Sequence, residues 1–355
     1  MQFTTAASLA RVQSDPEPNW HQQYKDSITK IETLCHALDL NPAQLPISPS
    51  ANRQFPLRVL WSYVQRMQKS TPDDPLLLQV LPHTLEEQES AEFYMDPVGD
   101  LQSIKSPGLL KKYHGRALLL ATSRCAVHCR YCFRRHFPYS SHNPRRDAWH
   151  AALENIADEA SISEVILSGG DPLVLSDPEL AGLARKLQSI PHVKRLRIHT
   201  RLPVVIPARI NDQLLEWLSS CSLKLVMVLH VNHPQELDHL LHEKLGELSD
   251  AGCCLLNQSV LLRNINDHPE ILATLSEKLF DSGVLPYYLH LPDKVQNTMH
   301  FDVGEAEACS IVSEMAARLP GYLVPRLVKE QAGQPCKTPV IPGTTPGPMR
   351  DYANN

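Results

Sequence analysis

Short apolar runs recur along the chain from residue 116 onward, and polar, helix-like segments separate them. Each run has the length of one buried strand, and successive runs are roughly thirty residues apart. Strands that alternate with helices in this way predict a parallel sheet built from βα units. Six units are fewer than the eight of a closed barrel, so we predict an α/β fold with an open, partial (β/α)6 barrel. The six predicted strands are 116–122, 164–170, 195–200, 223–232, 253–262 and 286–293.

The segments between these runs carry helix start and stop signals. In 176–190 we expect Asp177 to be the N-cap and Pro178 to take the first helical position. The segments 233–252 and 268–283 end at Gly252 and Gly283, as many helices do at their C-termini. These signals predict that helices connect the strands of the sheet.

Residues 1–107 lack this alternation of strands and helices. In 21–38 the apolar residues follow helical spacing, which predicts one amphipathic helix; they are Tyr24, Ile28, Ile31, Leu34 and Leu38. We therefore divide the chain into a helical N-terminal segment (1–107), a partial-barrel domain (108–337) and a tail rich in Pro and Gly (338–355). The last part of the tail is expected to be mobile.

Composition narrows the class of protein. Hydrophobic residues make up 43% of the 355 residues, which is enough for a large core, and the net charge of −5 gives no reason to expect a nucleic acid or an acidic membrane as partner. The N-terminus has no pattern of a secretory signal. No stretch approaches the ~20 apolar residues of a membrane span. We expect a soluble, cytoplasmic protein.

Polar residues follow each predicted strand. In parallel α/β folds the carboxyl ends of the strands meet at one edge, and binding sites form there. One polar strand end is well explained as a turn or a helix cap, but six together favour a shared cavity. The six ends are the cysteine-rich segment 124–139, 168–171, 199–201, 230–233, 257–259 and Asp293.

The segment 124–139, RCAVHCRYCFRRHFPY, contains three of the nine cysteines, Cys125, Cys129 and Cys132. An odd number of cysteines argues against a disulfide framework. Three thiolates on one short loop can bind a 4Fe–4S cluster and leave one iron open to a small molecule. The alternatives are a zinc site completed by His128 or His136, and three cysteines that bind nothing.

The spacing Cys-x3-Cys-x-aromatic-Cys, with Tyr131 as the aromatic residue, resembles the signature of the radical S-adenosylmethionine superfamily. The resemblance implies that the open iron binds the amine and carboxylate of S-adenosylmethionine. One-electron reduction then releases a 5′-deoxyadenosyl radical. The partial barrel predicted above is the fold of that superfamily.

The remaining motifs resemble the lysine 2,3-aminomutase family; they include CRYCFRRHF, SGGDPL, LRIHTRLPVVIPARI, HVNHPQE, NQSVLLRNIND, PYYLHLPD and GYLVPRLVKEQAGQPCKTPV. The resemblance implies that Lys337 holds pyridoxal phosphate as an internal aldimine. Without this resemblance, Lys337 would be interpreted as a surface lysine. The resemblance also implies a set of residues near S-adenosylmethionine, namely Ser168, Gly169, Gly170, Asp171, His230, Asn257 and Gln258. Paired glycines suit close approach of backbone to a ligand, although Ser168–Asp171 alone could be an ordinary turn.

The substrate residues follow from the same resemblance. Arg134 matches the arginine that binds the carboxylate of lysine, for which a guanidinium is well shaped. Asp293 matches a carboxylate that receives the side-chain ammonium. Glu330 stands where the family has a second aspartate, so its longer side chain changes the geometry. Two acidic groups favour a cationic substrate, because an acidic one would be repelled.

The short form of the chain resembles the elongation factor P branch of this family. That branch converts (S)-α-lysine to (R)-β-lysine, which a lysyl ligase attaches to elongation factor P. The expected partners are L-lysine, that ligase and an electron donor such as a flavodoxin or ferredoxin. The alternatives are an aminomutase for another amino acid, one acting on lysine already attached to elongation factor P, and a zinc-stabilised binding protein of translation.

Overall fold

The computed structural model describes residues 19–139 and 146–341. Within them, one ten-stranded sheet follows the order of the chain from β1 to β10. Strands β3 to β9 are parallel, while β1 and β2 pair antiparallel at one edge and β10 at the other. The strands are β1 (Ile104–Ser106), β2 (Leu109–Leu110), β3 (Arg116–Thr122), β4 (Glu164–Gly169), β5 (Arg195–Thr200), β6 (Lys224–Leu229), β7 (Cys254–Val260), β8 (Leu285–His290), β9 (Arg326–Lys329) and β10 (Thr338–Pro339).

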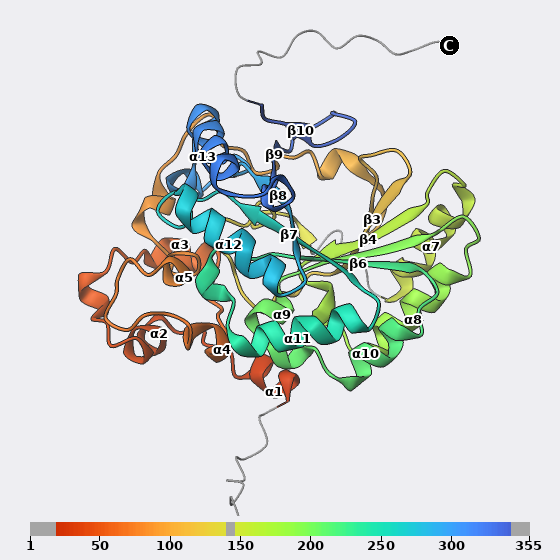
Figure 1. Cartoon of the computed structure of the whole chain (residues 1–355), viewed down its shortest axis with the longest axis horizontal. Coiled ribbons are helices and arrows are strands. Elements are labelled where there is room, and N and C mark those ends of the chain that lie inside the picture. Colours follow the sequence, from red (N-terminus) through yellow and green to blue (C-terminus); the bar gives the residue numbers. More distant parts are fainter. Residues whose placement is uncertain (1–18, 140–145, 342–355) are drawn as a thin grey trace, which may run out of the picture.

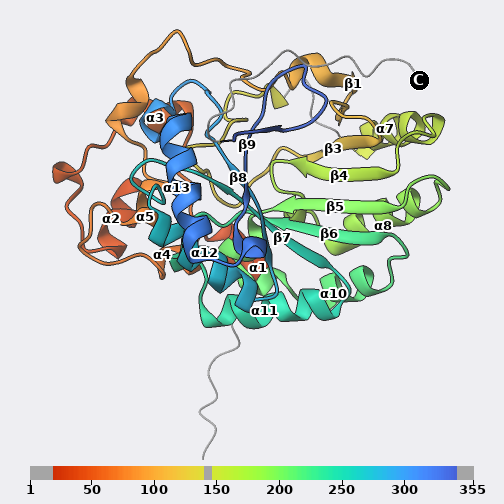
Figure 2. The same ribbon diagram turned by 45° about the horizontal axis from the view of Figure 1, so that its top comes forward.

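Helices connect the parallel strands and cover the outer face of the sheet (Figures 1 and 2). These are α7 (Arg146–Asp158), α8 (Asp177–Gln188), α9 (Leu202–Val205), α10 (Asp212–Ser219), α11 (His239–Asp250), α12 (Pro269–Asp281) and α13 (Glu305–Arg318). Short helices of the N-terminal segment lie at the left of Figure 1 and, for the first of them, at the bottom, away from α7 and α8. They are α1 (Trp20–Lys25), α2 (Ile31–Ala37), α3 (Pro49–Gln54), α4 (Trp61–Val64) and α5 (Pro75–Leu78). Short 3-10 helices are η1 (Pro42–Gln44), η2 (Thr84–Glu87), η3 (Leu101–Ser103), η4 (Pro172–Val174), η5 (Pro207–Arg209), η6 (Pro234–Glu236), η7 (Met299–Phe301) and η8 (Gly321–Leu323).

The predicted α/β fold is confirmed, and each of the six predicted strands is present. The sheet is not closed, because no pairing within the described residues joins β1 to β10. A seventh parallel strand, β9, was not predicted. It has only four residues and charged residues at both ends, so it lacks the long apolar run that revealed the others.

Local signals account for the ends of several elements. A capping box in which Glu179 bonds back to Ser176 starts α8, so the N-cap is Ser176 and not Asp177 as predicted. The chain turns after α11 at Gly252 and after α12 at Gly283, both with positive φ. The glycine signals at these two ends are therefore confirmed.

The single helix predicted for 21–38 is wrong, because two short helices, α1 and α2, occupy this stretch. Between them Ile28 pairs in antiparallel fashion with Val59, with both backbone hydrogen bonds near 3 Å. Ile28 is β-branched, which suits extended backbone, and its side chain is buried. Tertiary pairing thus outweighs the helical spacing of the apolar residues.

One continuous cluster of buried apolar side chains runs from Trp20 through the strands to Leu327. The N-terminal segment and the sheet therefore share a core. The domain boundaries at 107 and 337 stay predictions. The expected mobility concerns residues beyond 341, which lie outside the described residues. Within the described parts of the chain, no helix is long and apolar enough to span a membrane.

Candidate active site

Side chains at the carboxyl ends of the parallel strands lie close to one another. The ring of His199, in β5, is 5.8 Å from the ring of His230, which follows β6. The rings of Tyr288 and His290, both in β8, are 5.6 Å apart. We call the region around His199, His230, Tyr288 and His290 the polar edge.

Three imidazoles mark the interior of the polar edge. The Nε2 atoms of His199, His230 and His290 are buried and have no hydrogen-bond partner in the described parts of the chain. Burial is the main cause that lowers the pKa of each of these imidazoles, and the nearby positive charge of Lys337 lowers it further. The pKa of His230 falls to about 4. The rings are therefore neutral near pH 7. Because an unpartnered buried nitrogen is costly, these atoms indicate a place for polar ligand atoms.

The cysteine loop, residues 124–139, follows β3 and carries the three thiols, each partly exposed. The amide of Cys132 donates to the carbonyl of Cys129 at 3.0 Å, which closes a turn. Desolvation, and then the neighbouring Cys132 thiol, raise the pKa of Cys125. Desolvation and the Cys129 thiol likewise raise the pKa of Cys132 to about 11. The three sulfur atoms are thus close enough to influence one another.

This donor set suits an iron–sulfur cluster. Thiolates are the ligands that such clusters use, and the Nη1 of Arg201 donates to the Sγ of Cys129 at 2.7 Å. Among the described residues no three Cys, His, Asp or Glu side chains surround one point as ligands of a single ion do. The iron corners of a cubane are separate, so its cysteines need not meet at one point. Because Cys125 and Cys132 hold their protons in the free protein, cluster binding must release them.

Gly169 and Gly170 hold the cysteine loop against the end of β4. A Cβ on Gly169 would lie 2.4 Å from the carbonyl oxygen of Thr122, and one on Gly170 would lie 2.2 Å from that of Arg124. The amide of Gly170 donates to Thr122 at 2.7 Å. These two glycines therefore allow the backbone of Thr122 and Arg124, at the start of the cysteine loop, to approach closely. Their predicted proximity to S-adenosylmethionine stays a prediction.

Gly170→Ala is expected to displace the start of the cysteine loop, since the clash is with backbone that cannot rotate away. We expect a loss of about 1–3 kcal/mol of folding stability and reduced iron content after reconstitution. Thermal unfolding and iron analysis measure the two effects. Gly246→Ala is the matched control, because Gly246 lies in α11 and a methyl group there would have nothing within 4 Å. Equal behaviour of the two variants would contradict this role.

The polar groups of two predicted cofactor residues, Asp171 and Asn257, form hydrogen bonds with other parts of the protein. The carboxylate of Asp171 accepts from the Thr200 hydroxyl at 2.6 Å and from the Arg201 and Leu202 amides at 2.7 and 2.9 Å, which ties β4 to β5. The amide of Asn257 donates to and accepts from the backbone of Val231 at 3.0 and 2.9 Å. Both residues position the polar edge through these contacts.

Gln258 differs from its neighbour Asn257. Successive residues of a strand point to opposite faces, and Asn257 is buried whereas Gln258 is partly exposed. The side-chain amide of Gln258 makes no hydrogen bond with the described residues. Within the described part of the chain, Gln258 and His230 therefore have polar groups free for a ligand.

Arg134 is buried and held by two contacts. Its Nε donates to Asp100 at 2.7 Å, and its Nη1 donates to the hydroxyl of Ser168 at 2.9 Å. Lys112 also pairs with Asp100, at 2.7 Å. Burial alone would raise the pKa of Asp100, but the Arg134 and Lys112 cations lower it on balance. Asp100 thus stays ionised and fixes the direction of the guanidinium.

Lys337 reaches the same region by way of the β9–β10 hairpin. Its Nζ lies 2.8 Å from the carboxylate of Glu330, and 5.9 Å from the centre of the Tyr288 ring. Glu330 also accepts from the Tyr113 hydroxyl at 2.6 Å and lies 3.6 Å from Lys112. In the free protein the ammonium of Lys337 thus has a fixed counter-ion. Glu330 is within reach of the site but shared among three partners.

Asp293 follows β8, and its carboxylate has no hydrogen bond or ion pair with the described residues. Burial raises its pKa to about 7, against the opposing influence of Lys337 and with a further rise from Glu330. The influence of Lys337, Glu330, Lys112 and Asp100 on this pKa places Asp293 near the others. Without a partner among the residues that the structure describes, this acid is able to receive a cationic group.

Sequence reasoning missed Asp100, Lys112 and Tyr113 as members of this site. They precede the first parallel strand, where no strand–helix unit draws attention to them. His199 was included only as part of the polar strand end 199–201 and was given no role, and His290 was not selected. The signal that could have revealed His290 is its place in the predicted strand 286–293, three residues before Asp293.

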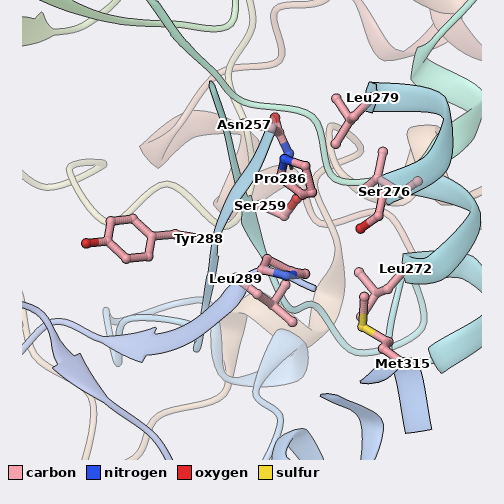
Figure 3. Close-up of a pocket in the computed structure, with 11 residues that line it drawn as sticks. Asn257, Ser259, Leu272, Ser276, Leu279, Pro286, Tyr288, Leu289 and Met315 are labelled. Carbon is pink, nitrogen blue, oxygen red and sulfur yellow. Dashed lines mark hydrogen bonds between the residues drawn. The ribbon is translucent and has the colours of Figure 1, made fainter. Parts of the chain in front are cut away.

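A small pocket elsewhere lies between β7, β8 and the helices α12 and α13 (Figure 3). In Figure 3 Leu289 points toward the helices and Tyr288 points away from them. The pocket is lined on the helix side by Leu272, Leu275, Ser276, Leu279 and Met315. It contains neither the cysteines nor Lys337, so it is a packing gap behind the sheet and not the site.

Comparison with known proteins agrees with this geometry. The model of the radical SAM superfamily matches residues 119–257, which span β3 and the cysteine loop to β7. Among solved structures, a radical S-adenosylmethionine methyltransferase from Kitasatospora setae overlaps 55% of this chain and 39% of its own, with a TM-score of 0.37 and 11% identity. That similarity is too low to bear on the fold.

Curated relatives match over most of the chain. A protein named L-lysine 2,3-aminomutase from Escherichia coli K12 is 46% identical over 335 residues, covering 94% of this chain and 98% of its own. One of the same name from Haemophilus influenzae is 46% identical, with coverage of 91% and 95%. Another from Clostridium subterminale is 32% identical, with coverage of 93% and 79%. The chain belongs to the L-lysine 2,3-aminomutase family of radical S-adenosylmethionine enzymes.

Proposed function

We propose that the protein is an isomerase that converts (S)-α-lysine to (R)-β-lysine. The observation that carries the proposal is the presence of Arg134, Asp293 and Lys337 at the polar edge beside the cysteine loop, in a chain 46% identical to relatives named for this reaction. A 4Fe–4S cluster, S-adenosylmethionine and pyridoxal phosphate are the cofactors of the family.

The residues of this chain would bind lysine at both ends. Arg134, oriented by Asp100 and Ser168, is suited to the substrate carboxylate. Asp293, which lacks a partner among the described residues, is suited to the side-chain ammonium, and Glu330 lies nearby. Holding both ends fixes the position of the carbons between them, which is the main contribution that a protein makes to such a reaction.

The cofactors supply the reactive chemistry, since the cluster with S-adenosylmethionine yields a radical that removes hydrogen and pyridoxal phosphate carries the migrating amino group. Cys125, Cys129 and Cys132 would hold the cluster, and Lys337 would hold pyridoxal phosphate. Gln258 and His230 offer free polar groups to S-adenosylmethionine. The neutral imidazoles keep the interior polar without adding charge.

We further propose that β-lysine serves the modification of elongation factor P in the cytoplasm. The motifs CRYCFRRHFPY and LLKKYHGRALLL, which resemble the elongation factor P branch of the family, support this role. A lysyl ligase would take the product, and a flavodoxin or ferredoxin would supply electrons.

An anaerobic assay tests the activity. The protein is reconstituted with iron, sulfide and pyridoxal phosphate, and L-lysine, S-adenosylmethionine and a reductant are added. β-Lysine that forms only with all components supports the proposal. Release of 5′-deoxyadenosine without β-lysine would keep the radical chemistry and favour another amino acid, or lysine attached to elongation factor P. Zinc in place of iron would favour a binding protein.

Asp293→Asn is expected to lower kcat/KM for lysine by about 30-fold or more, which corresponds to about 2 kcal/mol for a lost charge partner. Iron and pyridoxal phosphate content should not change. In the unmodified protein kcat/KM should rise with pH up to about 7, because only the ionised carboxylate of Asp293 pairs with an ammonium. That rise should be absent in the variant. Asp302→Asn is the control, because the charged neighbours of Asp302 are Lys294, Arg263 and Glu92, outside the site.

A further inference from the structure

Arg201 is a buried cation that contacts a cluster ligand directly. It follows β5 and is 5% exposed. Its Nη1 donates to the Sγ of Cys129 at 2.7 Å and to the hydroxyl of Tyr131 at 2.6 Å. Tyr131 is the aromatic residue of the cysteine spacing. The reaction proposed above gives Arg201 no role, since it contacts none of the residues assigned to lysine or pyridoxal phosphate.

The other half of the guanidinium is anchored away from the cluster. Its Nη2 donates to the Tyr63 hydroxyl at 2.9 Å, to Gln79 Oε1 at 2.7 Å and to Glu236 Oε2 at 2.9 Å. All three partners are fully buried. Glu236 itself accepts from the amides of Asn232 and His233 at 3.0 and 3.1 Å. Arg201 therefore cannot turn to solvent, and its positive charge stays beside the sulfur.

Attachment of the cysteine loop to the rest of the protein does not require the contact between Arg201 and Cys129. The cysteine loop is already attached to the N-terminal segment by Arg130, which donates from Nε to Glu86 at 2.8 Å and whose own amide donates to the carbonyl of Gln79 at 2.8 Å. What Arg201 adds is a buried N–H group aimed at a ligand sulfur. Hydrogen bonds to the sulfurs and local charge are the principal means by which a protein tunes the potential of such a cluster.

We propose that Arg201 raises the reduction potential of the cluster and that Glu236 partly offsets this effect. When the cluster gains one electron from an external one-electron donor, such as a flavodoxin-type protein, its net charge falls by one. No bond forms or breaks and no proton is taken up in this step. The fixed guanidinium stabilises the added negative charge on the cluster, and the carboxylate of Glu236 opposes it from the far side of Arg201.

The test is a redox titration of the reconstituted full-length protein, followed by electron paramagnetic resonance without S-adenosylmethionine or lysine. Arg201→Gln should reduce the equilibrium constant for one-electron reduction at least tenfold, a fall of about 59 mV in midpoint potential. Glu236→Gln should shift the potential in the opposite direction. In that variant Arg201 keeps its bonds to Cys129, Tyr131, Tyr63 and Gln79. Arg201→Lys, which keeps the charge, should restore part of the potential.

Arg209→Gln is the matched control. Arg209 is also fully buried and pairs with Asp177 at 2.8 Å, but it bonds to no cysteine of the described chain. It should lose stability and keep its potential. The proposal is overturned if Arg201→Gln and Arg209→Gln shift the potential equally, or if Glu236→Gln lowers it. If Arg201→Gln does not fold, the sign of the Glu236→Gln shift still decides. Because lysine is absent, failure of this proposal is separate from failure of the proposed substrate.

Discussion

Cys129→Ala will yield a colourless protein without aminomutase activity. Three thiolates on one loop hold the cluster, and the loss of one leaves a second iron without a protein ligand. It also leaves the Nη1 of Arg201 without its sulfur partner. Iron and sulfide analysis, the visible absorbance of the reconstituted protein and the β-lysine assay measure the result. We expect complete loss of all three signals.

Cys221→Ala is the matched control for this variant. Cys221 is a partly buried thiol packed on the hydrophobic core, remote in sequence from the cysteine loop. Its removal should leave iron content and turnover unchanged. An active, iron-containing Cys129→Ala protein would show that the cluster has other ligands. Equal binding of zinc by both variants would favour the alternative that the protein is a zinc-stabilised binding protein of translation.

The parallel sheet could be predicted because each of the six strands carries a row of buried residues: β3 is buried along most of its length, and in β5 the buried Leu196 and Ile198 alternate with more exposed neighbours. Six runs such as that of β3 are long and apolar enough to stand out without any partner. β9 could not be found in this way, since its place in the sheet depends on pairing with β8 and with β10. The same limit explains α1 and α2, where Val59 pairs with Ile28 and interrupts a helical pattern.

Part of the site was predicted from the resemblance to the lysine 2,3-aminomutase family and from the polar residues that follow the predicted strands. Neither source reveals how a polar side chain is used. Asn257 and Gln258 are adjacent and chemically alike, yet the first is bonded to the Val231 backbone and the second makes no such bond within the described chain. Asp100 holds Arg134 from a distant part of the chain. Such contacts arise only when the fold brings separate segments together, so local pattern cannot show them.

The chain before β3 thereby takes part in the site and does more than cover the sheet. Asp100 orients Arg134, and Tyr113 donates to Glu330 at 2.6 Å. Tyr63 and Gln79 anchor Arg201 beside the cysteine loop. A boundary at residue 107 therefore divides the chain by sequence pattern, while the site draws on both sides of that boundary.

Lys337→Ala will abolish the absorbance band of lysine-linked pyridoxal phosphate together with turnover. The β9–β10 hairpin places the Nζ of Lys337 2.8 Å from Glu330 and within reach of the Tyr288 ring, and no other described lysine has both contacts. Absorbance spectra after removal of unbound coenzyme measure the first effect. Iron content should be unchanged, which separates loss of the coenzyme from misfolding.

Lys329→Ala supplies the comparison, because Lys329 ends β9 on the same hairpin but pairs with Glu305 at 2.6 Å. It should keep both the band and the activity. An unaltered band in Lys337→Ala would move the covalent bond to another amine, and Lys112 would be the first to examine since it also lies 3.6 Å from Glu330.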